Sequence, residues 1–549
     1  MAYLHWLEEI LQELIDRKAN PVVLNTGKST SGETHIGIFR ELLICDCLGR
    51  LLEKMDSNWR FYFIADDFDA AKHFPSYVPK DFDHYIGTPF SDIPCPEDHC
   101  ESYGHHYAMN LIGTFDDFGI DPRIIWASKL YDSAEMKEAV RIALKNVEPI
   151  RKILKKYVAP TLREEEVEDY LIEMEERWPA TVVCEKCGKL QAKTEGRIQP
   201  NRITSFDPAT DKITYSCPAC GYEGETTIAK ARIKLTWRID WPAKWFILRV
   251  TCEPAGKDHT VKGGAYDTGL EICQKVYRFE GPLKVGYEWV RFGETDMKTH
   301  RGITFTPREF LRICSPEVLR YLILRTHPSK HISFRPRLLV QLVDEYDRFE
   351  KIYYNLEEAD EEEKREIKFL YPLCQVNETS SEIPKRLPYR FAVMFSQLEN
   401  LLTKEKILEK ATEVVKKTYQ ISEVTDEITR SIKMTLQRAE DWTKSYAPPQ
   451  FLLNIPKEVT NEIKQKLSDK QRKGLKLLAK TFQDGDLDEE ELQNKVFTLG
   501  KEELGIGAKK MFQAVYLALI GKKFGPRLAP FLLALERSWV IKRLLDAAN

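Results

Sequence analysis

The sequence predicts an α/β fold with a parallel sheet, interrupted by a small cysteine module and followed by an all-α region. Short apolar runs alternate with helical periodicity over residues 21–127, which is the βαβ rhythm of a parallel sheet. Two CxxC pairs then interrupt this rhythm between residues 184 and 220. Beyond residue 366, amphipathic helical patterns follow one another with few strand signals, which favours a helical bundle.

The N-terminal half of the α/β part can be divided into elements by its hydrophobic pattern. The first helix is expected to bury one face, which carries Leu4, Leu7 and Leu11. We expect strands at 21–25, 61–65 and 124–127, and helices at 3–19, 39–55, 105–118 and 134–157.

The turn after the first strand has the features of a nucleotide site. Residues 26–41 read TGKSTSGETHIGIFRE, and the next helix begins within them, so free backbone N–H groups and the helix dipole can attract phosphate. Gly37 lets a ligand approach the backbone, and His35 can donate to a phosphate oxygen. The stretch from Gly27 to Thr30 resembles the end of a P-loop. That motif needs a glycine where Val22 stands, so we exclude a P-loop.

The two CxxC pairs predict a structural zinc ribbon at residues 180–225. Cys184, Cys187, Cys217 and Cys220 form two knuckles separated by 29 residues, and a glycine after each knuckle relieves the tight turn. Four thiolates satisfy tetrahedral Zn²⁺ and leave no open position for catalysis. A redox CxxC motif would not need a second matching pair.

A second cluster of metal-ligand types lies before the helix expected at 105–118. It contains Cys95, His99, Cys100, His105 and His106. Its spacing matches no common zinc pattern, so the sequence does not favour a metal site there.

The α/β part is expected to resume near Thr236 and to end near Tyr287. Residues 307–355 read as helical, with helices beginning at Pro316 and at Pro336. The charged run at 357–366 is either a linker or the solvated end of a helix. Later helices are clearest at 425–446 and 511–520.

Composition limits the class of protein. With 549 residues and 43% hydrophobic content, the chain should form three or four domains. No apolar run approaches the roughly 20 residues of a membrane span, and the first residues lack a leader pattern, so we expect a cytoplasmic protein without membrane association.

Twelve cysteines fit metal binding in a reducing compartment, and Cys252 and Cys273 read as small core residues. The net charge of −3 neither supports nor excludes RNA binding. A tRNA ligand needs a local basic surface, which the basic stretches at 145–156 or 464–480 could supply.

Several motifs together resemble one family over nearly the whole chain. The segment SG-x-x-HIG ending at Gly37 is similar to the HIGH-type motif of class I aminoacyl-tRNA synthetases. Further matching segments are ADDFD at 65–69, ESY at 101–103, WRIDWP at 237–242, EPAGKDH at 253–259, GAYDTG at 264–269, GPRL at 525–528 and VIKRL at 540–544. In order and spacing they resemble an archaeal-type class I lysyl-tRNA synthetase.

This resemblance implies a Rossmann-type class I synthetase catalytic domain with a zinc-ribbon insertion, followed by an all-α C-terminal anticodon-binding domain. The expected domains are the first Rossmann half at 1–145, the connective insertion at 146–235, the second half at 236–290, a KMSKS-type loop with a stem-contact helical region at 291–355, and the anticodon-binding domain at 356–549. The implied reaction is activation of lysine with ATP and Mg²⁺, then transfer to the 3′-terminal adenosine of tRNA(Lys). We expect a monomer.

The resemblance also implies site residues. Activation aligns a carboxylate with the α-phosphate of ATP, so it needs no side-chain nucleophile. His35 and Gly37 would bind ATP. The candidates for the amino acid or the adenosine are Gly27, Ser29, Glu41, Trp237, His259, Tyr266 and Asp267, where the two aromatic residues Trp237 and Tyr266 could instead belong to the core.

The second ATP motif departs from the family pattern. In the KMSKS-type loop at 296–303, only Met297 and Gly302 match, although Lys298, His300 and Arg301 keep the loop basic. Met297 and His300 would contact ATP, and Lys298 and Arg301 would be catalytic cations. Arg301 is the best candidate to stabilise the negative charge that develops on the leaving pyrophosphate.

These departures, with Ile38 at the fourth HIGH position, leave three functions open. The first is a lysine–tRNA ligase. The second is a paralogue that uses another amino acid or acceptor, and the third is a non-catalytic RNA-binding protein.

Overall fold

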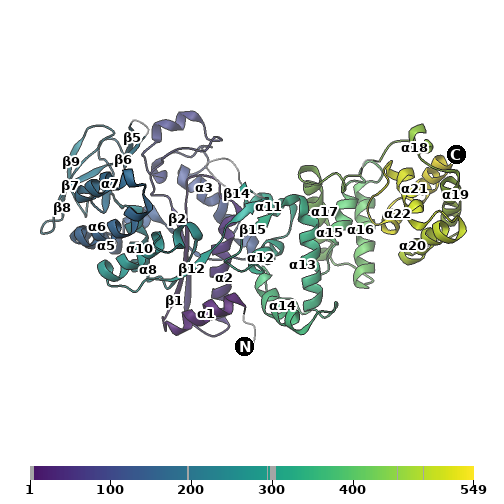
Figure 1. The fold of residues 1–549 in the computed structure, drawn as a ribbon, viewed down its shortest axis with the longest axis horizontal. Helices are drawn as coiled ribbons and strands as arrows, with labels where there is room; N and C mark the ends of the chain where they lie inside the picture. Colours follow the sequence, from purple (N-terminus) through teal and green to yellow (C-terminus); the bar gives the residue numbers. More distant parts are fainter. Residues whose placement is uncertain (1–4, 195–196, 294, 297–304, 454, 486–487) are drawn as a thin grey trace. The chain divides into compact units, whose positions relative to one another are not determined.

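The structure is a computed structural model that describes the chain except residues 1–4, 195–196, 294, 297–304, 454 and 486–487 (Figure 1). It contains two compact units. Unit 1 comprises residues 1–310, 316–334 and 358–379, and unit 2 comprises residues 311–315, 335–357 and 380–549.

A five-stranded parallel sheet forms the centre of unit 1. Its order is β12–β11–β1–β2–β3, and the strands are β1 (Val22–Ser29), β2 (Trp59–Asp66), β3 (Arg123–Trp126), β11 (Cys252–Gly256) and β12 (Leu283–Tyr287). The chain adds strands to one side of β1 and later to the other side, so the order reverses between β1 and β11. In an open α/β sheet, ligands bind at this point, beyond the carboxyl ends of the strands. The three strands predicted in the first half are confirmed.

Helices of unit 1 surround this sheet. They are α1 (Trp6–Asp16), α2 (Phe39–Glu53), α3 (Tyr103–Ile112), α4 (Ala127–Tyr131), α5 (Ala134–Lys145), α6 (Val147–Val158), α7 (Glu164–Glu176), α8 (Trp237–Leu248), α9 (Lys257–Thr260) and α10 (Ala265–Ile272). The helix predicted at 134–157 is divided in two at Asn146. The predicted helices at 3–19, 39–55 and 105–118 correspond to α1, α2 and α3, and the short 3₁₀ helix η1 (Ile36–Ile38) precedes α2.

Helix α2 is buried on nearly all sides, including three of its charged residues. Buried charges need partners because burial removes their hydration. Arg40 donates to the backbone carbonyls of Thr326 and Lys330, and Asp46 pairs with the buried Arg320 at 2.6 Å. The third charge, Glu41, accepts a hydrogen bond from the Tyr287 hydroxyl, and no basic residue pairs with it among the described residues. Glu41 therefore differs from Asp46 in that its charge is not balanced by a partner of opposite charge in the part of the chain that is described.

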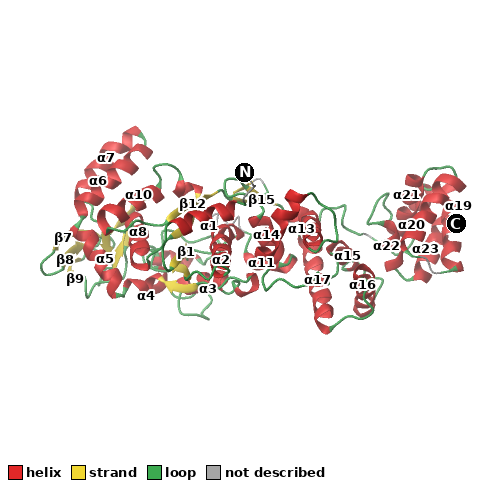
Figure 2. Ribbon diagram, turned by 90° about the horizontal axis from the view of Figure 1, so that it is seen from below, coloured by secondary structure: helices red, strands yellow, loops and turns green. Residues whose placement is uncertain are grey.

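The cysteine module is built from short antiparallel strands. They are β4 (Ala180–Val182), β5 (Gln191–Thr194), β6 (Arg197–Pro200), β7 (Arg202–Asp207), β8 (Lys212–Ser216), β9 (Glu223–Thr227) and β10 (Ile233–Leu235). Strand β8 is the middle strand of a three-stranded sheet with β7 and β9, and both views show this sheet beside α5 at one end of unit 1 (Figures 1 and 2).

The segment after the central sheet mixes strands and helices. It contains β13 (Val290–Phe292), β14 (Thr295–Asp296), α11 (Pro307–Ile313), α12 (Pro316–Leu324), β15 (Ile332–Phe334) and α14 (Glu361–Cys374). The helix predicted to begin at Pro316 is confirmed, whereas β15 was not expected. Asp360 caps α14, so the charged run at 357–366 is largely the start of a helix rather than a linker. Arg320 on α12 donates to the carbonyl of Leu373, which ties α14 into unit 1.

The described part of unit 2 is helical, as the sequence predicts for the C-terminal region (Figure 2). Its helices are α13 (Leu339–Tyr353), α15 (Tyr389–Phe395), α16 (Lys404–Tyr419), α17 (Asp426–Ser445), α18 (Asn461–Gln465), α19 (Asp469–Asp484), α20 (Glu489–Thr498), α21 (Ala508–Ile520), α22 (Leu528–Ala534) and α23 (Arg537–Ala548). Side-chain oxygens of Thr403, Thr425 and Ser468 cap α16, α17 and α19. In the part of the chain that is described, no helix has the length and apolar character needed to cross a membrane.

Candidate active site and metal clusters

A cavity of about 500 Å³ lies at the carboxyl ends of β1, β2, β11 and β12. This is the position that the strand order predicts for a ligand. Seven residues that the sequence selected line it, namely Gly27, Ser29, His35, Gly37, Glu41, Trp237 and His259. The structure therefore brings together residues from β1, η1, α2, α8 and α9.

Two other predicted residues lie outside the cavity. Tyr266 is fully buried. Its hydroxyl lies 3.0 Å from the carbonyl oxygens of both Glu253 and Leu283, to which it donates, so it links β11 to β12. Asp267 accepts from the backbone N–H of Gly263 and pairs with Lys284 at 2.7 Å. Both side chains are used in structural contacts and neither is among the residues that line the cavity, so their contact with the amino acid stays a prediction.

The second ATP motif is predicted at residues 296–303. Met297, Lys298, His300 and Arg301 lie outside the described residues.

His35 is held as a neutral hydrogen-bond donor. Its Nδ1 accepts from the N–H of Gly37 at 3.1 Å, which places the ring proton on Nε2. Burial, with a smaller contribution from the nearby charge of Lys28, lowers the pKa of His35 to about 4. At neutral pH the free Nε2–H can therefore donate to an anionic ligand without carrying a charge of its own.

Glu41 is the buried carboxylate that is open to a cationic ligand. Its carboxylate accepts from the Tyr287 hydroxyl at 2.6 Å, and no basic residue pairs with it among the described residues. Burial raises the pKa of Glu41 to about 7. Tyr287, the last residue of β12, was not selected from the sequence. It could have been found as the residue at the carboxyl end of the expected final strand.

Glu253 is the contrasting carboxylate of the cavity. It is buried and accepts from Asn25, Trp241 and Trp245 at 2.6, 2.7 and 2.7 Å. With three donors already bound, Glu253 fixes the aromatic floor and is less available than Glu41.

A buried charge cluster borders the cavity on the β2 side. Lys234 contacts Asp66, Asp69 and Asp240 at 3.1–3.2 Å, and Lys244 contacts Asp66 and Asp240 at 2.6 and 2.8 Å. Three carboxylates thus surround two ammonium groups, which leaves one negative charge uncompensated. Asp69 has one ion-pair partner and a side chain that is 36% exposed, so it carries the accessible end of this cluster.

Aromatic rings form the rim of the cavity. Trp237 is 48% exposed and stacks on Trp241, with ring centroids 5.7 Å apart, and the His259 ring lies 5.4 Å from Trp237. The alternative in which Trp237 belongs to the core is therefore wrong. Such a rim can cover the methylene groups or the base of a ligand.

The zinc-ribbon cysteines form a compact group. The sulfurs of Cys184 and Cys220 are 3.6 Å apart, as are those of Cys187 and Cys217, and all four lie within 4.8 Å of one another. A tetrahedral site with Zn–S bonds of about 2.3 Å has an S–S edge of about 3.8 Å, so the geometry fits zinc. Gly188 and Gly221, after the knuckles, have φ values of +71° and +68°.

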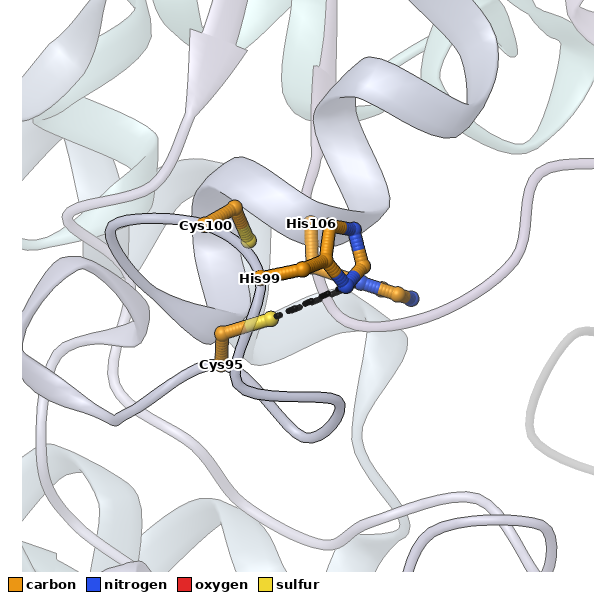
Figure 3. Close-up of side chains that lie close together, drawn as sticks. All are labelled: Cys95, His99, Cys100 and His106. Atoms are coloured by element: carbon orange, nitrogen blue, oxygen red, sulfur yellow. Dashed lines mark hydrogen bonds between the residues drawn. The ribbon is translucent and has the colours of Figure 1, made fainter.

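A second group is also compact, against the expectation from its spacing. Cys95, His99 and Cys100 lie on the loop before α3, and His106 lies on α3 itself; Figure 3 shows their side chains gathered around a common centre. The Cys95 sulfur is 3.9 Å from His99 Nδ1 and 3.7 Å from His106 Nδ1. This Cys₂His₂ set could hold a metal ion. His105 does not join it, because its ring stacks on Trp126.

The two basic stretches differ in how their charges are used. On α6, Lys155 and Lys156 pair with Glu175 and Glu271. On α19, Lys470, Lys473, Lys476 and Lys480 are exposed and have no ion pair in the part of the chain that is described. Helix α19 is therefore the better candidate for a contact with nucleic-acid phosphates.

Comparisons with known proteins agree with this architecture. The family model described as tRNA synthetases class I (K) matches residues 4–377, and an anticodon binding domain model matches residues 390–548. A protein named lysine–tRNA ligase from Methanocaldococcus jannaschii is 36% identical over 98% of this chain and 99% of its own length. Another of that name, from Archaeoglobus fulgidus, is 34% identical over 99% of this chain and 100% of its own length.

Proposed function

The chain belongs to the class I tRNA synthetase (K) family, and on this premise we propose that it activates lysine with ATP and transfers it to the 3′-terminal adenosine of tRNA(Lys). The matches extend over the catalytic and the anticodon-binding regions, so both parts that such a reaction needs are present.

The charge pattern of the cavity is the observation that best supports lysine. A lysine substrate has two ammonium groups, and the cavity has two acidic positions with uncompensated charge. Glu41 on α2 is buried without a basic partner, and Asp69 after β2 carries the open end of a cluster with one excess negative charge. We assign the ε-ammonium to Glu41 with Tyr287, and the α-ammonium to Asp69. Buried carboxylates bind ammonium strongly because little water screens the pair.

ATP would occupy the side of the cavity next to η1. His35 Nε2–H would donate to a phosphate oxygen, and Gly37 would let the nucleotide lie close to the backbone. Mg²⁺ would enter with the phosphates as part of the ATP substrate. For the amino acid, Gly27 and Ser29 would line the path to its carboxylate, while Trp237 and His259 would cover its methylenes or the adenine.

The tRNA would be read by the helical region. The anticodon model covers residues 390–548, and the unpaired lysines of α19 lie within it. We keep the domain boundaries at 145, 235, 290 and 355 as proposals. We also place the protein in the cytoplasm, since none of its twelve cysteines forms a disulfide and a reducing compartment would preserve that state. A monomer is kept as a proposal.

Zinc is proposed at both clusters. Cys184, Cys187, Cys217 and Cys220 would hold one ion, and Cys95, His99, Cys100 and His106 would hold a second. Each set supplies four protein ligands and no open position, so both ions would stabilise the fold and neither would activate a substrate.

Metal analysis tests this proposal. We expect about two zinc ions per chain, and Cys217→Ser and Cys100→Ser should each remove about one of them. Cys217→Ser should increase proteolysis within 180–225 and leave the 95–106 loop intact, whereas Cys100→Ser should do the reverse. The buried Cys273→Ser lies in neither cluster and should keep both ions. Zinc-free protein that retains full protection from proteolysis would contradict the proposal.

Amino-acid-dependent pyrophosphate exchange tests the proposed function. We expect exchange with lysine and little with amino acids that lack a side-chain cation, because these leave Glu41 without a partner. Exchange with a different amino acid would identify a paralogue of other specificity. Absence of exchange with every amino acid would favour the non-catalytic alternative.

A further inference from the structure

Lys28 is a basic residue inside a cavity that otherwise selects a cation. It lies near the carboxyl end of β1, between Gly27 and Ser29, and lines the cavity with them. Its side chain is half-buried, and among the described residues no hydrogen bond or ion pair engages its ammonium group. A partly desolvated cation without a partner is unfavourable unless a ligand provides the opposite charge.

The ammonium of Lys28 acts on three separate walls of the cavity. Its charge contributes to the lowered pKa values of His35 and His259, which burial chiefly causes. It also opposes the rise that burial produces in the pKa of Glu41. These residues come from η1, α9 and α2, so the ammonium is close to the space that they enclose.

The ammonium groups of a lysine substrate cannot be the partner of Lys28, because like charges repel each other. The anionic parts of the reactants are the amino-acid carboxylate and the ATP phosphates, and Lys28 lines the same cavity as His35. The loop at 296–303 departs from the family pattern in its basic residues. A cation fixed on a buried strand would supply positive charge where the phosphate reacts.

We propose that Lys28 is a further catalytic residue, whose ammonium contacts the α-phosphate of ATP where the lysine carboxylate attacks it; this inference rests on the proposed function. In that step a carboxylate oxygen forms a bond to the α-phosphorus. The bond from this phosphorus to the oxygen bridging the β-phosphate breaks, and pyrophosphate leaves with the electron pair. No proton moves and nothing is oxidised, so Lys28 stays protonated and stabilises the charge of the transition state.

Single-turnover kinetics of the full-length protein test this role. Lys28→Ala and Lys28→Gln should slow adenylate formation by about ten- to hundred-fold, and should slow the reverse reaction with pyrophosphate by the same factor, because a transition-state contact serves both directions. The dissociation constant of lysine should be unchanged or lower, since a repulsive charge near Glu41 is removed. Lys28→Arg should keep more of the rate than Lys28→Gln.

Lys262→Ala is the matched control, because Lys262 is an exposed lysine of unit 1 outside the cavity, and it should leave both rates unchanged. Lys28→Gln keeps most of the length of the side chain, so a fold that does not tolerate alanine at this position still yields a testable variant. Unchanged rates, or a loss found only in lysine affinity, would overturn the proposal while the wild type still makes adenylate. A wild type that makes no adenylate would instead overturn the proposed function.

Discussion

Glu41→Gln should lower kcat/KM for lysine by roughly 30- to 4,000-fold, which corresponds to the roughly 2–5 kcal/mol lost when one partner of a buried charge pair is removed. Glutamine keeps the shape and can still bond Tyr287, but it has no charge for the ε-ammonium. The loss should appear mainly in the KM for lysine, with the KM for ATP little changed. Steady-state pyrophosphate exchange measures all of these quantities.

The same residue predicts how lysine binding depends on pH. Burial raises the pKa of Glu41 to about 7, so the empty site holds a partly protonated carboxyl at neutral pH. Only the ionised form pairs with ammonium, so lysine affinity should rise between pH 6 and pH 8 and then level off. Glu41→Gln should abolish this rise in calorimetric titrations.

The raised pKa of Glu41 also determines how the free energy of unfolding depends on pH. Ionising a buried carboxylate is easier in the unfolded chain, so the contribution of Glu41 to the free energy of unfolding is present at low pH and is lost as pH rises through about 7. Bound lysine should restore it, so lysine should raise the melting temperature more at pH 8 than at pH 6. Glu33→Gln is the control, because burial also raises the pKa of Glu33 outside the cavity. If lysine affinity stays the same between pH 6 and pH 8 and is also unchanged by Glu41→Gln, the assignment of the ε-ammonium to Glu41 is wrong.

His35→Ala should slow adenylate formation by roughly ten- to thousand-fold, because the donor to the transferring phosphate acts chiefly in the transition state. The affinity for tRNA should change little. The pKa of His35 is lowered by burial to about 4, so the ring stays neutral and the rate should show no inflection from it between pH 6 and pH 8.

A second variant separates catalysis from local folding. His35 Nδ1 also caps the N–H of Gly37, so the alanine variant loses about 0.5–2 kcal/mol of helix capping. His35→Asn keeps a capping oxygen and should recover stability with only part of the rate. Recovery of the full rate by asparagine, or unchanged exchange in His35→Ala, would mean that His35 has no role at the phosphate.

The sequence predicts those parts of the site that are local in the chain. Gly27, Ser29, His35 and Gly37 share one strand and turn, so a single motif places them together. Glu41 follows one helical turn later. The four zinc-ribbon cysteines are also local, since each knuckle positions two thiolates by itself.

Other parts depend on tertiary packing and could not be predicted in this way. Tyr266 and Tyr287 are both tyrosines near the second half of the sheet, and only the packing of α10 beneath β12 decides that Tyr266 is buried while Tyr287 faces the cavity. The cluster of Cys95 and His106 joins a loop to a helix, so its spacing follows no regular pattern. The ion pairs around Lys234 join separate segments of the chain, and no local motif encodes them.

Charging of tRNA(Lys) by the purified full-length protein tests the central claim most directly. With radioactive lysine, ATP and Mg²⁺, the wild type should form lysyl-tRNA that disappears when the terminal adenosine is removed or oxidised, and it should leave a tRNA of different identity largely uncharged. Glu41→Gln should reduce this charging by at least as much as it reduces lysine activation. If the protein binds tRNA(Lys) but attaches no lysine, and forms no adenylate with any amino acid, the ligase account is wrong.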